Sequence, residues 1–144
     1  MTRLLFDLNV LLDVLLDRKP HAAAAAALWG EIERGRAEGL VPAHGMTTIA
    51  YLAQRARGRR FARRAVADLL SVFGVATVDD AIVRRAAGLD WTDFEDAVCA
   101  VAAQAASCAA VVTRDPHGYR ASPVPALDAP SALALVRTAA KADG

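Results

Sequence analysis

The chain has 144 residues, of which 55% are hydrophobic and 23% charged, with a formal net charge of +1. This composition excludes a disordered chain, and the length suits one domain with one hydrophobic core. The two cysteines, Cys99 and Cys108, form no CxxC pair and have no histidine cluster beside them, which argues against a zinc site or a disulfide framework and favours a cytoplasmic protein.

The N-terminal segment combines a strand, an acid and a helix. Residues 3–6 are apolar enough for a short buried strand, and from Asn9 the apolar residues recur at helical intervals, with Asp13 and Asp17 on another face. Asp7 lies between the two elements, where open α/β sheets bind ligands. A carboxylate in this place needs a partner, either a metal ion or the backbone of the helix that it would cap. The acids also interrupt the apolar run, so we expect no signal peptide, and no segment is long and apolar enough to suggest a membrane span.

Strands and helices alternate along the rest of the chain. Further strands are expected over residues 39–43, 75–78, 109–113 and 124–127, and further helices over 21–35, 46–57, 59–73, 79–87, 92–107 and 130–141. This alternation predicts an α/β fold with a mostly parallel five-stranded sheet and helices on both faces. We expect a polar turn through His44 and Gly45, one domain over residues 1–144, and a frayed tail after residue 141.

Acidic residues fall at three points that this fold would bring together. Asp7 follows the first strand, Asp115 follows the fourth, and Asp93 and Asp96 stand at the start of the longest helix. The carboxyl ends of parallel strands share one edge of the sheet, and a helix start can bring Asp96 to it. Gathered carboxylates repel one another unless a cation lies among them, and Mg²⁺ or Mn²⁺ is the usual ion. Such an ion can activate water and stabilise charge on a phosphate.

Each of these motifs also has a purely structural interpretation. Thr92 and Glu95 have the spacing of a capping box, and Asp115 before Pro116 is typical of a turn. No Ser/His/Asp or Cys/His set competes with the acids. The scattered histidines are expected at the surface or in loops: His21, His44 and His117.

With these motifs, the chain resembles the PIN-domain family, in particular the VapC-type toxins of bacterial type II toxin–antitoxin pairs. The segment LLFDLNVLLDVLLDR is similar to the opening of the family, with Asp7 as first acid and Asn9 in the D-x-N pattern. DFEDAVCAVAA is similar to its third-acid helix and VVTRDPHGYRASPVPAL to its closing motif, which places the third and fourth acids at Asp96 and Asp115 and an aromatic residue at Tyr119.

The resemblance implies a single-domain, Rossmann-like fold and Mg²⁺- or Mn²⁺-dependent cleavage of RNA. It implies that Asp7, Asp96 and Asp115 are catalytic residues and metal ligands, with Asp93 as a further candidate ligand. Asn9 and Thr113 take supporting positions in the same motifs. The expected partners are an RNA substrate, a small antitoxin protein and a second copy of the chain in a homodimer.

One departure from the family pattern concerns the second acid. The family carries Glu in a T-x-x-E-L pattern, whereas this chain has Tyr51 at that position and no acid between Glu38 and Asp68. The metal site would be one ligand short unless Asp93 or Glu95 compensates. The alternative function is therefore a PIN-like module that binds RNA or a partner but cuts weakly.

Two further features have competing interpretations. Arginines gather around residues 55–64, and Arg60 and Arg63, with Arg114, are candidate RNA contacts because phosphate contacts supply most sequence-independent affinity. The alternative is a solvated helix face, since few aromatics are interleaved for base stacking. The opening motif also resembles haloacid dehalogenase-like phosphatases, but these need a second Asp where this chain has Asn9, and the chain lacks their downstream lysine motif.

Overall fold

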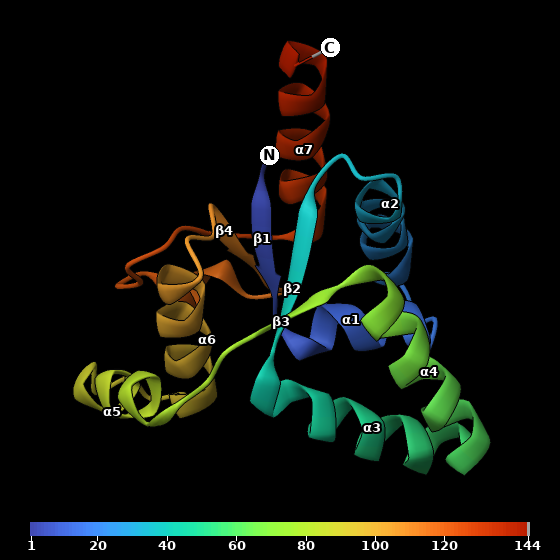
Figure 1. Ribbon diagram of the computed structural model, residues 1–144, viewed down its shortest axis with the longest axis horizontal. Helices are drawn as coiled ribbons and strands as arrows, with labels where there is room; N and C mark the ends of the chain where they lie inside the picture. Colours follow the sequence, from blue (N-terminus) through green and yellow to red (C-terminus); the bar gives the residue numbers. More distant parts are fainter. Residues whose placement is uncertain (144) are drawn as a thin grey trace.

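The computed structural model describes residues 1–143, within which five strands and seven α-helices alternate (Figure 1). The strands are β1 (Arg3–Phe6), β2 (Glu38–Pro42), β3 (Gly74–Ala76), β4 (Ala110–Val112) and β5 (Ala126–Leu127). The helices are α1 (Leu8–Leu15), α2 (Ala22–Glu33), α3 (Ala43–Arg57), α4 (Arg59–Val72), α5 (Asp80–Gly88), α6 (Phe94–Ala105) and α7 (Ala129–Asp143), with a 3₁₀ turn, η1 (Pro116–Tyr119), after β4.

All five strands run parallel, in the order β3-β2-β1-β4-β5. The predicted α/β fold is confirmed, and the sheet is wholly rather than mostly parallel. The chain moves outward from β1 through β2 to β3, and then returns to the other side of β1 to form β4 and β5. The switch point therefore lies between β1 and β4, whose carboxyl ends pair through Phe6 and Val112. Ligands of open α/β sheets bind at this place.

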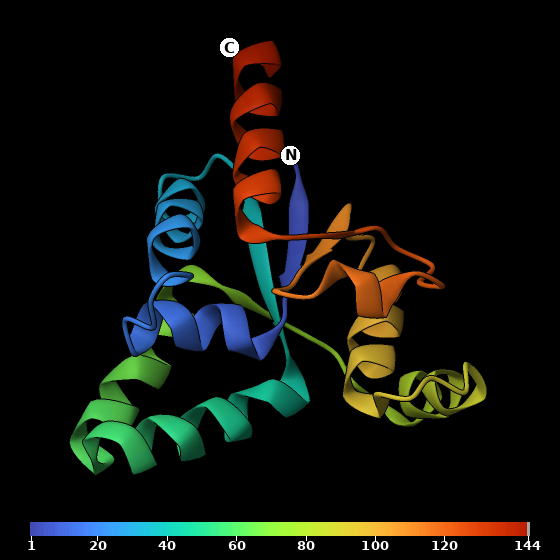
Figure 2. The ribbon, with the colours of Figure 1, turned by 180° about the vertical axis from the view of Figure 1, so that it is seen from behind.

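Each face of the sheet has its own hydrophobic core, and alternate residues of β1 divide between them. Leu4 and Phe6 pack with residues of α1, α2, α3, α4 and α7, whereas Leu5 packs with α5 and α6. Figure 1 accordingly shows α5 and α6 on one side of the strands and α1 to α4 on the other, and Figure 2 shows α7 projecting past the amino ends of β1 and β2. Helices on both faces were predicted and are confirmed.

The start of α3 differs from the prediction. The helix begins at Ala43, directly after β2, so the expected turn through His44 and Gly45 is wrong. Pro42 takes the N-cap position, and its fixed φ and missing N–H suit a helix start. A Cβ on Gly45 would meet Leu8 Cβ at 3.8 Å, an ordinary van der Waals contact, so the start of α3 lies against α1.

The C-terminal helix α7 reaches Asp143, two residues beyond its expected end. Across residues 1–143, every helix falls short of the length or the apolar character that a membrane crossing requires.

Candidate active site

Asp7 is held in place by the backbone on one side and by the neighbouring strand on the other. Its Oδ1 accepts a hydrogen bond from the Asn9 N–H at 3.3 Å, which caps α1. Its Oδ2 accepts one from the Thr113 hydroxyl at 3.1 Å. The capping interpretation of Asp7 is therefore correct, yet the carboxylate also faces the switch point and keeps 7% exposure.

Thr113 links the first acid to the loop that carries the fourth. The hydroxyl that donates to Asp7 accepts a hydrogen bond from the Asp115 N–H at 3.2 Å, and Thr113 itself is buried. Because β1 and β4 pair in parallel, Asp7 and Asp115 meet at one edge of the sheet, as the sequence predicts. Thr113 therefore lies between the two acids and is hydrogen-bonded to both residues.

Asp96 reaches the same edge from the first turn of α6. Its N–H donates to Asp93 Oδ1 at 3.1 Å, so Asp93 is the N-cap and the predicted capping box of Thr92 with Glu95 is displaced by one residue. Its Oδ1 accepts a hydrogen bond from the Tyr119 hydroxyl at 3.3 Å. The aromatic residue of the closing motif thus fixes the orientation of the third acid.

The acids at this edge are close enough to perturb one another. Burial raises the pKa of Asp7, and hydrogen bonds from Asn9 and Thr113 oppose that rise. Burial, followed by the charges of Asp93 and Asp7, raises the pKa of Asp96 to about 6. None of the ion pairs found among residues 1–143 involves these acids. The charge of Arg114 acts on Asp7 without forming an ion pair with it, so the group keeps an excess of negative charge, which a cation would stabilise.

Glu95, which the sequence offers together with Asp93 as a substitute for the missing second acid, is a further charged residue of this group. The pKa of its half-buried carboxyl is raised by burial and then by the charge of Asp7, so it adds to the negative charge at this edge. Glu95 is therefore a candidate for the ligand that is missing at Tyr51.

The donors fit a hard divalent cation in their chemistry, although no three His, Cys, Asp or Glu side chains in the described chain converge closely enough to hold a metal ion. Mg²⁺ needs only one or two protein carboxylates, because it keeps waters and takes substrate phosphates. A glycine leaves room between two of the acids. A Cβ on Gly118 would lie 3.4 Å from Asp115 Oδ2 and 3.6 Å from Asp96 Oδ2.

His44 lies near this edge, contrary to the expectation that it is a surface or loop residue. Both of its ring nitrogens are buried, and neither has a hydrogen-bond partner among residues 1–143. Burial lowers the pKa of the imidazole, and the charge of Asp7 opposes that fall. His44 is the second residue of α3. The sequence analysis placed a turn there, and so did not predict that this histidine lies near the acids.

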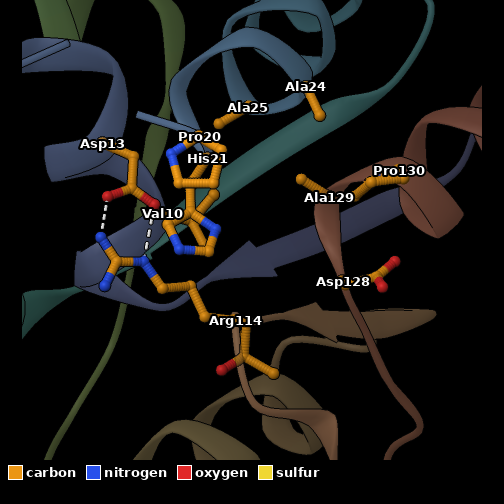
Figure 3. Close-up of a pocket in the computed structure, with 11 residues that line it drawn as sticks. Val10, Asp13, Pro20, His21, Ala24, Ala25, Arg114, Asp128, Ala129 and Pro130 are labelled. Carbon is orange, nitrogen blue, oxygen red and sulfur yellow. Dashed lines mark hydrogen bonds and ion pairs between the residues drawn. The ribbon is translucent and has the colours of Figure 1, made fainter. Parts of the chain in front are cut away.

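Arg114, predicted as an RNA contact, is engaged within the protein. Its guanidinium forms a two-pronged ion pair with the carboxylate of Asp13, with one bond at 2.8 Å from Nε to Oδ2 and a second from Nη2 to Oδ1 (Figure 3). Asp13 is 1% exposed and also pairs with Arg18 at 2.9 Å. Asp13 and Arg114 line a cavity of about 230 Å³ between α1, α2 and the start of α7. Sequence reasoning assigned Asp13 to a polar face and missed this pairing.

Three other predicted residues lie away from the acids. Tyr51 is 60% exposed on α3, with the Arg55 guanidinium over its ring at 5.8 Å from the centroid. Arg60 and Arg63 are exposed at the start of α4. Figure 1 shows α3 leading away from the sheet edge toward this turn. At 1.5 Å per residue, the 15 residues of α3 span roughly 20 Å between the end of β2 and the turn that leads to the arginines.

The fold and site together define a doubly wound, Rossmann-like α/β protein with an acidic site at the switch point of its sheet. Residues 3–117 match the family described as PIN domain. The chain therefore belongs to the PIN-domain family, and the resemblance found in its sequence is confirmed. No curated protein matches the chain.

Solved structures share the fold at low sequence identity. VapBC-1 from nontypeable Haemophilus influenzae aligns with a TM-score of 0.67 at 11% identity, over 90% of this chain and 98% of that one. VapBC2 from Rickettsia felis, bound to a DNA fragment from its promoter, gives 0.66 at 9%, over 88% and 98%. VapC20 from Mycobacterium tuberculosis, described as a toxin that cleaves the sarcin-ricin loop, gives 0.62 at 17%, over 75% and 86%.

Proposed function

We propose that this protein is a metal-dependent endoribonuclease that hydrolyses RNA phosphodiester bonds as the toxin of a cytoplasmic toxin–antitoxin pair. The observation that carries the proposal is the cluster of Asp7, Asp96 and Asp115 at the switch point, where burial raises the pKa of Asp7 and of Asp96, and where none of the three carboxylates takes part in the ion pairs found among residues 1–143. Membership of the PIN-domain family supports it, because PIN nucleases use divalent metal ions.

The three aspartates, with Asp93 or Glu95 as a further donor, would hold Mg²⁺ or Mn²⁺. When bound, the ion supplies an activated water and stabilises the charge on the phosphate. The protein contributes the positions of the acids. Thr113 fixes the first relative to the loop of the fourth, and Tyr119 orients the third.

The test is cleavage of a mixed RNA pool with Mg²⁺, with Mn²⁺ and with a chelator, for the wild type and for Asp7→Asn. Asn caps helices as well as Asp does, so this change keeps the cap of α1, while it removes one charge and the second oxygen, which accepts the Thr113 hydroxyl. Asp79→Asn is the matched control, because Asp79 also caps a helix, α5, and lies outside the acid cluster. We expect cleavage that requires the metal and Asp7 but not Asp79. Equal cutting by the wild type and Asp7→Asn would overturn the assignment or reveal a contaminating nuclease.

A second candidate is a PIN module that binds RNA or a partner without cutting it. The observation in its favour is that the acids of the described chain form no three-ligand cage. A folded wild type that binds RNA and never cuts it with either metal would favour this function.

We propose two protein partners, a small antitoxin and a second copy of the chain. Structural neighbours described as VapBC complexes support the first, and the family resemblance supports the second. The molar mass of the purified protein in solution, measured alone and after co-expression with the product of an adjacent small gene, tests both.

A further inference from the structure

A cavity of about 420 Å³ opens directly beside two of the acids. Its walls come from the loop before α6, which contributes Asp90 to Asp93, and from four residues in and after η1, namely His117, Gly118, Arg120 and Ala121. Asp96 and Asp115 form part of its lining, so any group that fills the cavity lies next to the proposed reaction centre. The volume falls in the range of small-ligand sites.

Trp91 gives this cavity an aromatic wall with a rigid support. Its ring meets that of Tyr119 edge to face, with centroids 5.7 Å apart and planes at 86°. Tyr119 is 3% exposed and is hydrogen-bonded to Asp96, so the support is part of the core. Trp91 itself is half-buried. A partly exposed aromatic side chain held in this way is a stacking surface for an unpaired base.

The polar groups of the cavity suit a base better than a second phosphate. Asp90 and Asp93 are hydrogen-bond acceptors with negative charge, which disfavours a bare phosphate and favours a base edge with amino donors. Arg120 forms none of the ion pairs found among residues 1–143, which leaves its guanidinium available to the sugar–phosphate chain at the rim.

We infer that this cavity binds one unstacked nucleotide next to the phosphodiester that is cut, with its base on Trp91 and its amino edge toward Asp90 and Asp93. The inference rests on the proposed function and deepens it, because it makes the substrate single-stranded RNA. Bases in a duplex remain stacked and paired and do not enter such a cavity. Cytosine, adenine and guanine carry an exocyclic amino group that the acidic wall can accept, and uracil does not.

The first experiment measures binding without cleavage. Fluorescence anisotropy of labelled oligo(C), oligo(U) and a duplex, with a chelator present, is compared for the wild type, Trp91→Ala, Trp91→Phe and Phe94→Ala. Phe94 is the matched control, because it is a 50% exposed aromatic residue at the start of α6 that does not line the cavity.

We expect Trp91→Ala to bind oligo(C) about tenfold more weakly, as the loss of one stacked base predicts, and to lose the preference over oligo(U). Trp91→Phe keeps a ring against Tyr119 and should retain most of the binding, while Phe94→Ala should match the wild type. Unchanged binding by Trp91→Ala, or an equal loss in Phe94→Ala, would overturn the inference. The thermal midpoint of each variant shows whether it is folded.

The second experiment separates this inference from the proposed function. With Mg²⁺ or Mn²⁺ present, Trp91→Ala should raise KM for single-stranded RNA more than it lowers kcat, whereas Asp7→Asn should abolish cleavage. Asp7-dependent cleavage that is indifferent to Trp91 would refute the nucleotide pocket and leave the nuclease assignment intact. Binding that depends on Trp91 in a protein that never cuts would support the pocket and refute the nuclease.

Discussion

Asp13 offers a sharp test of how the site is supported. Its carboxylate is 1% exposed and is paired with Arg114 and with Arg18, whose side chains are 35% and 34% exposed. Asp13→Asn removes the charge and keeps the shape. Removing one partner of a fully buried pair costs about 3–5 kcal/mol, because the other charge is left without compensation. Here both guanidinium groups keep a third of their exposure to water, and Asn still accepts one hydrogen bond, so we expect a loss of about 2 kcal/mol.

The assay is urea unfolding of the wild type, Asp13→Asn and the control Asp17→Asn. Asp17 is exposed, lies just beyond the end of α1 and forms none of the ion pairs found among residues 1–143, so its substitution should leave the free energy of unfolding unchanged. Arg114→Gln should cost less than Asp13→Asn, because Asp13 retains Arg18. Equal unfolding midpoints for Asp13→Asn and the wild type would refute the reasoning that the pair stabilises the fold.

Three further outcomes are expected. Arg36 lowers the pKa of Glu31 below its ordinary value of 4.5. The stability that Glu31 contributes is therefore present above that value and is lost as the pH falls through the lower pKa of the folded state. The free energy of unfolding in urea should thus change less between about pH 7 and about pH 3 in Glu31→Gln than in the wild type. The double variant Arg60→Gln with Arg63→Gln should bind single-stranded RNA more weakly. The slope of log K against log salt concentration should become shallower by about 0.7 for each phosphate that the protein no longer neutralises. Unchanged binding would mean that both arginines lie on a solvated face. Tyr51→Glu should not raise metal-dependent cleavage, because the side chain is 60% exposed on α3, and a rise would place this position at the metal.

The topology and the position of the first acid could be predicted because both depend on local patterns. Three apolar residues followed by Asp7 mark the end of a buried strand, and the alternation of elements implies a parallel sheet whose carboxyl ends meet. Asp115 follows another apolar run in the same way. Local pattern also has limits of about one residue, as at α6, where Asp93 rather than Thr92 takes the cap.

The missed residues depend on contacts that local pattern does not encode. Asp13 has the helical spacing of a solvent-facing acid, yet it is buried because Arg114, 101 positions away in the chain, packs against it. The same contact gives Arg114 a structural role where the sequence predicts RNA binding. His44 was hidden because Pro42 starts a helix at once instead of a turn. For Asp13 and Arg114 the deciding partner lies far away in the chain, whereas for His44 it lies two residues before it.

The segment from Thr113 to Asp115 connects stability to the proposed chemistry. Thr113 donates to Asp7, Arg114 pairs with Asp13 on α1, and the backbone N–H of Asp115 returns to Thr113. The position of the fourth acid relative to the first is therefore set partly by an ion pair that carries no chemistry itself. A protein weakened by about 2 kcal/mol remains mostly folded well below its thermal midpoint. If Asp13→Asn cleaves RNA more slowly than the wild type at such a temperature while Asp17→Asn does not, the lower cleavage rate reports a displaced Asp115 rather than unfolding.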